Sequence, residues 1–257
     1  MPQATLGDLT MYYEEHGDRD GAPLVLLHGW GGVADVWRPQ VDAFGARYRL
    51  IVPDLRGHGR TDNPGGPGAM NHRRFARDII ALCRALGVER AVFCGHSTGA
   101  MLLLTLALAA PALAGALVLA AGTYYYGPEL RAWWREQTPE TIVSDPAEAR
   151  ARHTALGPDH WRLVAEGFIA LNAHAHAEDF PEAEELRAIA APTLILHGDR
   201  DRFFPVQIPT GLYRLLPDAE LCILPMTGHA PPTERVEWFN AIVLDFLDRR
   251  VDGGARA

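Results

Sequence analysis

A serine between two glycines is the residue of this chain best suited to nucleophilic chemistry. The motif Gly95 to Gly99, which reads Gly-His-Ser-Thr-Gly, follows the apolar run 91–94 and precedes a segment of helical character. A serine on a sharp turn between a strand and a helix exposes its hydroxyl, and small residues two positions away on each side let strand and helix approach. This context predicts a nucleophilic Ser97 rather than a glycine-rich turn with a helix-capping serine.

A serine hydroxyl is a weak nucleophile at neutral pH, so it needs a base and an acid that orients the base. His229 lies near the C-terminal end of the chain, after the last expected strand, which agrees with the order serine, acid, histidine. The acid should follow the strand before it, where the run 198–201 offers Asp199 and Asp201. We favour Asp201, because Asp199 directly follows the turn glycine and is better placed to bind amides of its own loop. Asp199 stays the alternative.

The developing oxyanion needs two converging backbone N–H donors. The residue after the nucleophile, Thr98, should supply the first. The second should come from the loop after an earlier strand, here His28 to Gly32 with its three glycines, and we expect the amide of Trp30 to point inward. The indole of Trp30 could wall the pocket or serve packing alone.

The elements that must position these residues alternate along the chain. Helix-length segments lie between short apolar runs, so we expect an α/β fold with a mostly parallel, twisted sheet and helices on both faces. The expected strands are Thr10 to Glu15, Leu24 to Leu27, Leu50 to Val52, Ala91 to Cys94, Ala116 to Leu119, Thr193 to Leu196 and Leu221 to Leu224. The expected helices cover about 35–44, 73–86, 98–109, 206–215 and 233–249.

The alternation of strands and helices stops over about sixty residues, which contain helical patterns but no convincing strand. This segment is too long to be a loop without secondary structure. We therefore expect a core of residues 1–122 and 188–257 and an inserted helical lid of residues 123–187. Aromatic residues crowd the start of the insertion, and we expect some of them to line a substrate pocket together with Trp30, although packing between lid helices is the more common role. The candidates are Tyr124, Tyr125, Trp133 and Trp134.

Composition excludes several classes of function. The formal net charge is -8, from 24 Lys and Arg against 32 Asp and Glu, which argues against nucleic acid as a partner. The apolar segment 99–122 is interrupted by Pro111 and Gly115, so it reads as a buried helix and strand rather than a membrane span. The three cysteines match no disulfide or zinc pattern and the first residues do not resemble a secretory signal, so we expect a cytoplasmic protein.

No metal or other cofactor is expected. The closely spaced His174 and His176 would point to different faces of a helix, and no HExxH-type pair occurs. The expected partner is a small-molecule ester or lactone, and the oligomeric state is left open.

Five motifs together resemble the α/β-hydrolase superfamily, and within it the small esterases and lactonases typified by pimeloyl-ACP methyl ester esterases and 3-oxoadipate enol-lactonases. They occur in the family's order over nearly the whole chain outside the lid. The resemblance assigns the acid to Asp201 and the oxyanion amides to Trp30 and Thr98, and it implies a mainly structural role for 54–61. The motifs are segments 27–31, 54–61, 95–99, 198–205 and 228–229.

The sequence thus predicts a serine hydrolase that cleaves a carboxylic ester or lactone through an acyl-enzyme on Ser97. The same triad could serve a C–C bond hydrolase, an acyltransferase or a cofactor-free perhydrolase. From another class of function, a weakly catalytic ligand-binding receptor could share the fold. A haloalkane dehalogenase or epoxide hydrolase is disfavoured, because those enzymes use a carboxylate nucleophile in this fold.

Overall fold

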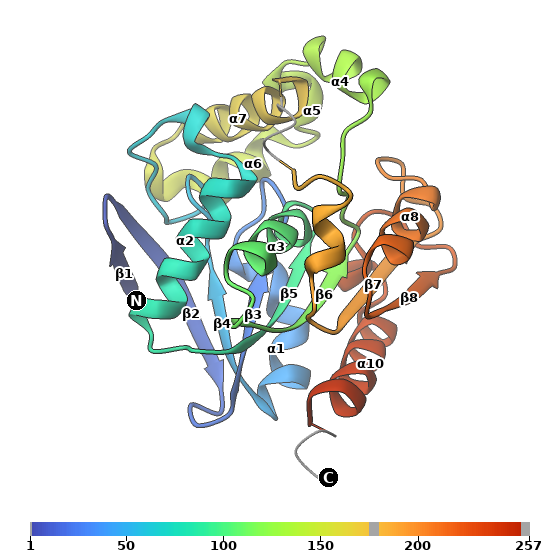
Figure 1. The fold of residues 1–257 in the computed structure, drawn as a ribbon. Helices are drawn as coiled ribbons and strands as arrows, with labels where there is room; N and C mark the ends of the chain where they lie inside the picture. Colours follow the sequence, from blue (N-terminus) through green and yellow to red (C-terminus); the bar gives the residue numbers. More distant parts are fainter. Residues whose placement is uncertain (1, 175–179, 253–257) are drawn as a thin grey trace.

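An eight-stranded sheet forms the centre of the molecule (Figure 1). The structure is a computed structural model that describes residues 2–174 and 180–252. In spatial order the strands are β1-β2-β4-β3-β5-β6-β7-β8, and all neighbours from β4 to β8 run parallel. The strands are β1 (Gln3–Leu6), β2 (Leu9–Gly17), β3 (Ala22–Leu27), β4 (Tyr48–Pro53), β5 (Ala91–His96), β6 (Ala114–Ala120), β7 (Thr193–Gly198) and β8 (Ala219–Leu224).

Helices cover both faces of the sheet, as expected from the alternation of elements. The helices of the core are α1 (Arg38–Gly45), α2 (His72–Ala85), α3 (Thr98–Ala109), α8 (Gln207–Leu215), α9 (Pro231–Glu234) and α10 (Val236–Leu247). The expected helix 233–249 is divided, because Arg235 adopts an extended φ of -135° between α9 and α10. Short 3₁₀ helices occupy Ala34–Trp37, Pro67–Ala69, Thr154–Leu156 and Glu185–Ala188, and a π-helical turn occupies Asp248–Asp252.

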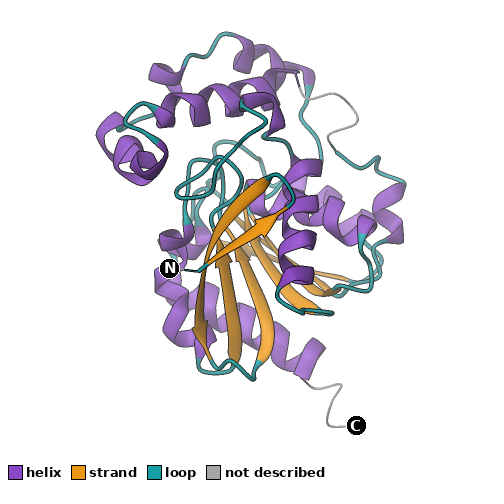
Figure 2. Ribbon diagram, turned by 90° about the vertical axis from the view of Figure 1, so that its left-hand side faces the viewer, coloured by secondary structure: helices purple, strands orange, loops and turns teal. Residues whose placement is uncertain are grey.

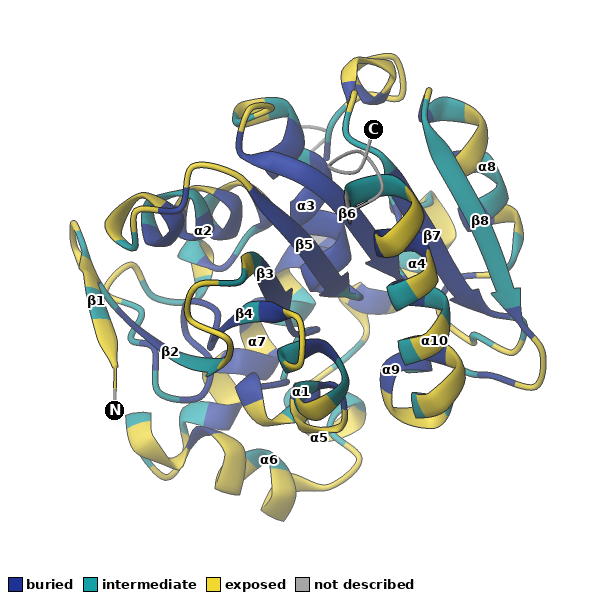
Figure 3. Cartoon of the chain, turned by 90° about the horizontal axis from the view of Figure 1, so that it is seen from below, coloured by how far each residue is buried: buried dark blue, intermediate teal, exposed yellow. Residues whose placement is uncertain are grey.

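Two hydrophobic layers hold the sheet between the helices. On one face, Val25, Phe93 and Leu117 pack with residues of α2, α3 and α8. On the other, alternate residues of the same strands, such as Leu24 and Val92, pack with α1 and α10. Successive side chains of a strand point to opposite faces. The continuous apolar runs therefore bury both faces, and Figure 3 shows the central strands buried.

Strand β1 was not among the expected strands. It pairs antiparallel with β2, with Leu6 opposite Leu9, so Gly7 and Asp8 form a two-residue hairpin loop. Gly7 has a φ of +69°, a conformation that a tight hairpin needs and glycine readily adopts. The strand escaped prediction because it has only four residues and lies at the sheet edge, where none of them is fully buried.

Helices between β6 and β7 lie over the carboxyl ends of the parallel strands (Figure 2). The sequence predicted helices without strands in this region, and the described residues agree. We call these helices the lid. They are α4 (Pro128–Arg135), α5 (Pro139–Ile142), α6 (Pro146–His153) and α7 (His160–His174).

No helix among the described residues is both long enough and apolar enough to cross a membrane. This includes α3, which overlaps the apolar segment 99–122. That segment forms the buried helix α3 followed by the buried strand β6.

Candidate active site

Ser97 occupies the sharp turn between β5 and α3. Its φ of 51° and ψ of -116° are strained for a residue with a side chain. The flanking glycines make the turn possible. A Cβ on Gly95 would lie 2.3 Å from the carbonyl carbon of Gly99, and a Cβ on Gly99 would lie 2.2 Å from the carbonyl oxygen of Leu27. Only glycine therefore fits at either position.

The structure brings together three residues that lie far apart in the sequence. The Nε2 atom of His229 lies 3.0 Å from Oγ of Ser97, and Nδ1 of His229 lies 2.8 Å from Oδ2 of Asp201. Each residue follows the carboxyl end of its own strand, β5, β7 or β8, so all three meet at one edge of the sheet. Because a carboxylate only accepts hydrogen bonds, Nδ1 carries the proton and Nε2 is free to accept the serine proton.

Asp201 rather than Asp199 faces the imidazole. Its second oxygen, Oδ1, accepts hydrogen bonds from the backbone amides of Phe203 and Phe204 at 2.8 and 3.1 Å. Burial by itself would raise the pKa of Asp201, but the hydrogen bonds from His229 and these amides hold it below the ordinary value. Asp199 instead accepts a hydrogen bond at 3.2 Å from the amide of Thr227, which lies in the loop after β8 rather than in the loop of Asp199 itself, as the sequence had suggested.

The loop after β3 passes directly beside the nucleophile. A Cβ on Gly29 would lie 3.1 Å from Cβ of Ser97, so Trp30 follows immediately after the closest approach. The loop closes with a hydrogen bond from the amide of Gly32 to the carbonyl of Gly29 at 3.0 Å, and Gly31 has a φ of +71°. Thr98 begins α3, and the first amides of a helix have no acceptor within the helix. Both predicted oxyanion donors therefore belong to segments that flank Ser97.

Two buried histidines stabilise the loops around the site. His28 donates from Nδ1 to the carbonyl of Gly29 at 2.7 Å and accepts the amide of Leu55 at Nε2 at 2.9 Å. Burial lowers the pKa of His28 to about 3, so it stays neutral and keeps both bonds. His96 donates from Nε2 to the carbonyl of His229 at 2.7 Å, and burial lowers its pKa to about 4. It links the turn at Ser97 to the loop that carries His229.

The segment 54–61 has contacts of the structural kind that the family resemblance implied. Asp54 accepts the amide of Ala34 at 2.7 Å and the amide of Arg60 at 2.9 Å. The fully buried guanidinium of Arg56 forms two hydrogen bonds with Asp78 of α2, at 2.7 and 2.8 Å. None of these contacts involves Ser97, Asp201 or His229.

A cavity of about 190 Å³ opens onto Ser97 and His229. Its walls combine the nucleophile turn, the loop after β3, the lid and the two phenylalanines after Asp201. No Arg, Lys, Asp or Glu of the described residues lines it, so the substrate would meet mostly aromatic and aliphatic surface. The lining residues are Gly29, Trp30, His96, Ser97, Met101, Tyr126, Leu130, Trp134, Phe168, Asn172, Phe203, Phe204 and His229.

Among the aromatic residues predicted for the pocket, Trp30 and Trp134 line this cavity, whereas Tyr124, Tyr125 and Trp133 do not. Trp133 and Tyr125 are each 46% exposed. Consecutive residues of a helix point about 100° apart, so Trp133 faces solvent when Trp134 faces inward. The hydroxyl of Tyr124 instead lies against α8, 2.6 Å from where a Cβ on Gly211 would be.

Several lining residues were not predicted from the sequence. Tyr126 belongs to the same aromatic run as Tyr124, but nothing in the run distinguishes the inward member. Phe203 and Phe204 could have been found, because they follow Asp201 by two and three residues. Their ring centroids lie 4.8 and 5.5 Å from that of His229.

No group of three or more His, Cys, Asp or Glu side chains within the described parts of the chain is arranged to hold a metal ion. His176, one of the two histidines considered for a metal, lies outside the described residues. The side chain of His174 is likewise not described.

Comparison with protein families identifies the superfamily. A family model described as "alpha/beta hydrolase fold" matches residues 22–154, slightly more than half of the chain. The chain belongs to the α/β-hydrolase fold family. The sequence resemblance and the eight-stranded, mostly parallel sheet agree with this assignment.

Individual relatives of this α/β-hydrolase carry names that specify different reactions. "Putative carbamate hydrolase RutD" of Azorhizobium caulinodans is 32% identical over 96% of this chain and 98% of its own. A 2-hydroxy-6-oxononadienedioate/2-hydroxy-6-oxononatrienedioate hydrolase of Burkholderia vietnamiensis is 31% identical over 94% of this chain and 92% of its own. The solved enol-lactonase of Burkholderia xenovorans LB400 has a TM-score of 0.79 with 24% identity, covering 96% of this chain and 100% of that one. The solved enol-lactonase shows the same fold, and the names of both curated relatives describe hydrolysis, so this α/β-hydrolase is likewise a hydrolase.

Proposed function

We propose that this α/β-hydrolase cleaves a carboxylic ester or lactone with a small, uncharged acyl group, through an acyl-enzyme on Ser97. The observation that carries the proposal is the continuous hydrogen-bonded series Ser97–His229–Asp201, with contacts of 3.0 and 2.8 Å, at the wall of an apolar cavity. A nucleophile, a base and an orienting acid in this geometry form an acyl-transfer site.

The first half of the reaction forms the acyl-enzyme. Oγ of Ser97 attacks the substrate carbonyl carbon while Nε2 of His229 takes its proton. The backbone amides of Trp30 and Thr98 donate hydrogen bonds to the carbonyl oxygen as it becomes an oxyanion. His229 then gives its proton to the leaving alcohol, and the C–O bond to that alcohol breaks.

The second half releases the acyl group as an acid. Nε2 of His229 accepts a proton from water, whose oxygen attacks the acyl carbon, and then returns the proton to Oγ of Ser97. Asp201 keeps the proton of the imidazole on Nδ1 and stabilises its cationic form. Because the pKa of Asp201 lies below its ordinary value, the carboxylate stays ionised throughout.

The cavity favours a small apolar acyl group. An apolar cavity of about 150 Å³ accommodates benzene, so the 190 Å³ beside Ser97 suits a benzoyl group or a short branched chain. A substrate with two carboxylates, as in the name of the Burkholderia vietnamiensis relative, would find no cationic Arg or Lys side chain among the described lining residues. The name of the Azorhizobium relative mentions a carbamate. A carbamate ester is uncharged and offers a similar planar carbonyl, so it belongs in the substrate panel.

Labelling with a fluorescent fluorophosphonate tests whether Ser97 is an activated nucleophile. The wild-type protein should be labelled, and Ser97→Ala should not. Turnover of p-nitrophenyl butyrate and benzoate should fall on the order of a million-fold in the same variant. The panel also includes a phenyl carbamate and a δ-lactone, with products identified by mass spectrometry.

The chain provides a matched control, because Ser144 is its only other serine. Ser144→Ala should keep full labelling and turnover. A circular dichroism melt of Ser97→Ala should match that of the wild type. Ester turnover near the wild-type rate in a folded Ser97→Ala variant would refute the proposal. Labelling that is lost in Ser144→Ala but kept in Ser97→Ala would refute it as well.

A further inference from the structure

A second cavity lies beneath the lid, next to the one that contains the nucleophile. It also measures about 190 Å³. Residues of α6, α7 and the segment 142–145 line it, and neither Ser97 nor His229 is among them. We call the cavity at Ser97 the catalytic chamber and this one the lid chamber.

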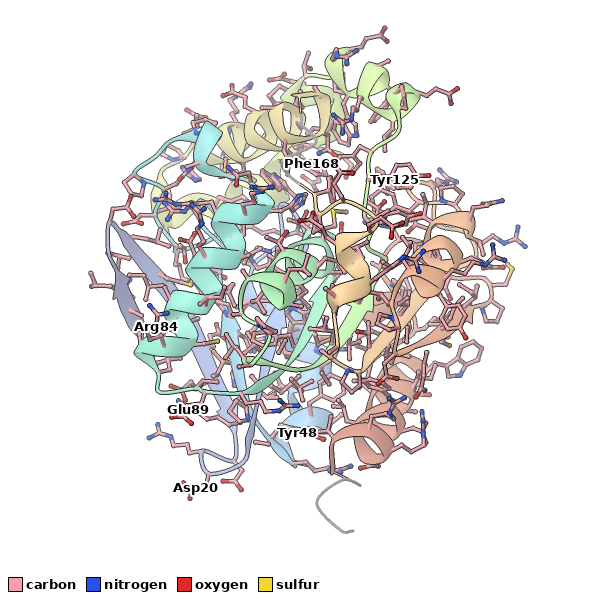
Figure 4. All side chains as sticks on the ribbon, in the orientation of Figure 1. Asp20, Tyr48, Arg84, Glu89, Tyr125 and Phe168 are labelled. Carbon is pink, nitrogen blue, oxygen red and sulfur yellow. The ribbon has the colours of Figure 1, made fainter. Side chains whose placement is uncertain are left out.

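The two chambers share two lining residues, Trp30 and Phe168. Their rings stack with centroids 5.1 Å apart and an interplanar angle of 17°. Trp30 comes from the loop after β3, and Phe168 comes from α7 of the lid, where Figure 4 labels it. The stacked pair therefore stands between the chambers as a common wall.

Contacts on both sides hold this wall in place. Nε1 of Trp30 donates a hydrogen bond to the carbonyl of Val164 at 2.7 Å, one helical turn before Phe168. The ring of Trp134 packs edge-on against Phe168 with centroids 4.7 Å apart. On the core side, the indole of Trp30 packs edge-on against His58 at 5.2 Å. Trp30 is thus positioned by several partners besides Phe168.

The lid chamber has both apolar and charged lining residues. Val164, which accepts the hydrogen bond of Trp30, lies with Ala165 and Trp161 on α7, the helix that carries Phe168. Ile142 and Val143 add apolar surface, and the charged residues Asp145, Glu148 and Arg152 lie in α6 or directly before it. A saturated chain that crossed the wall would first meet apolar surface, and each methylene removed from water adds binding free energy.

We propose that the stacked pair of Trp30 and Phe168 sets the upper limit of acyl-chain length, and that Phe168 is the residue that closes the catalytic chamber toward the lid chamber. This proposal rests on the proposed function, because it takes the catalytic chamber as the site of the acyl group. With the wall in place the enzyme takes short acyl groups. Without the phenyl ring the two chambers join, and a longer linear acyl chain fits.

Phe168→Ala tests the role of the wall through the ratio of kcat/KM for p-nitrophenyl octanoate to that for the butyrate. We expect this ratio to rise on the order of ten-fold above that of the wild type. Leu130→Ala is the matched control, because Leu130 lines the catalytic chamber but not the lid chamber. It enlarges the catalytic chamber without joining it to the second one, so the ratio should change much less. Phe168→Leu, which keeps part of the wall, should lie between wild type and Phe168→Ala.

Two kinetic results with Phe168→Ala and its control would overturn the inference. One is an unchanged ratio in a Phe168→Ala protein whose thermal melt shows that it is folded. The other is an equal rise in Leu130→Ala, which would mean that volume at Ser97, rather than passage between the chambers, sets chain length. If Phe168→Ala does not fold, the octanoate-to-butyrate ratio of kcat/KM in Phe168→Leu tests the inference instead. A ratio in Phe168→Leu no higher than that of the wild type would reject the role of the wall.

A binding experiment separates this inference from the proposed function. Linear 2-alkanones carry a carbonyl but no leaving group, so their affinity can be measured by calorimetry in Ser97→Ala and in Ser97→Ala/Phe168→Ala. Tighter binding of 2-decanone relative to 2-hexanone in the double variant supports the joined chambers even if no ester is hydrolysed. Ester hydrolysis with no such change in relative affinity would leave the proposed function standing and reject the wall.

Discussion

One hydrogen bond determines the protonation of the His229 nitrogen that faces Ser97. Nδ1 donates to Oδ2 of Asp201, so Nε2 is left without a proton beside Ser97. Asp201 in turn is held by the amides of Phe203 and Phe204, and Nε2 of His197 lies 3.3 Å from the same Oδ2. The carboxylate has little freedom to rotate away, so the orientation of the base is built into the loop after β7.

Replacing Asp201 by asparagine should remove this control of the tautomer. The amide nitrogen of the new side chain could donate to Nδ1, which places the remaining proton of His229 on Nε2, where it cannot accept the proton of Ser97. We expect Asp201→Asn to lower kcat for p-nitrophenyl butyrate on the order of 10⁴-fold, with little change in KM. Asp199→Asn, which alters a hydrogen bond from Thr227 and an ion pair with Arg200, should stay within about ten-fold of wild type. The reverse ranking would assign the acid to Asp199.

At the scale of the element, the turn from β5 into α3 depends on close backbone contact. Helix α3 starts directly after Ser97, and its first turn lies against the end of β3 through Gly99. Glycine inside a helix normally costs about 0.5–1 kcal/mol relative to alanine. Here the absent side chain is what lets helix, strand and nucleophile turn come together.

Gly99→Ala should therefore destabilise the protein even though alanine is the better helix former. Its Cβ would lie 2.2 Å from the carbonyl oxygen of Leu27, so β3 and α3 would have to separate. We expect a fall of at least about 2 kcal/mol in the free energy of unfolding, measured by urea denaturation. Gly68→Ala is the control, because a Cβ there meets no atom within 4 Å, and its stability should change by less than about 1 kcal/mol. Equal stability of the two variants would contradict the close-contact argument.

At the scale of the whole molecule, buried histidines lie where the lid meets the core. His58 of the core lies between His28 and His153, with ring centroids 5.2 and 5.8 Å away. His153, from α6 of the lid, accepts the amide of Gly59 at Nδ1, and His160 of α7 donates to the carbonyl of Gly57. Burial lowers the pKa of His28, His58 and His153 to about 3, so all three are neutral when the protein is folded.

These groups should make the protein sensitive to mild acid. Below about pH 6.5 the unfolded chain binds a proton at each histidine, while the folded chain does not bind one until about pH 3. Stability is therefore highest above pH 6.5 and falls as the pH drops from 6.5 toward 3. For each fully buried histidine, we expect the free energy of unfolding to fall by about 2 kcal/mol when the pH is lowered from 6.5 to 5.

Urea denaturation at pH 7.5, 6.0 and 5.0 measures this loss. His58→Gln removes one buried imidazole and should lose less stability between pH 7.5 and 5.0 than the wild type does. Gly68→Ala, which alters no titratable group and meets no atom within 4 Å, should follow the wild-type curve. Identical pH dependence in His58→Gln and wild type would show that His58 contributes nothing to the acid sensitivity.

Much of the core could be predicted from the chain because its signals are local. Apolar runs of strand length and the glycines around Ser97 depend only on neighbouring residues, so the seven expected strands and the nucleophile turn followed directly. Strand β1 lacks such a signal, since it is an edge strand with no fully buried residue. The aromatic run 124–126 was ambiguous for a related reason: three identical side chains in succession do not show which one faces inward.

The sequence by itself determined the fold and the set of residues able to form a triad. In a parallel sheet the carboxyl ends of β5, β7 and β8 lie at the same edge, whatever path the connecting segments take. Only the tertiary structure decided which carboxylate faces His229 and which aromatic rings face Ser97. Those choices depend on side-chain direction within loops and lid helices, where a difference of one residue turns a ring by about 100° on a helix. The wall between the two chambers likewise exists only in the tertiary structure, because Trp30 of the core and Phe168 of the lid meet only when the lid lies on the core.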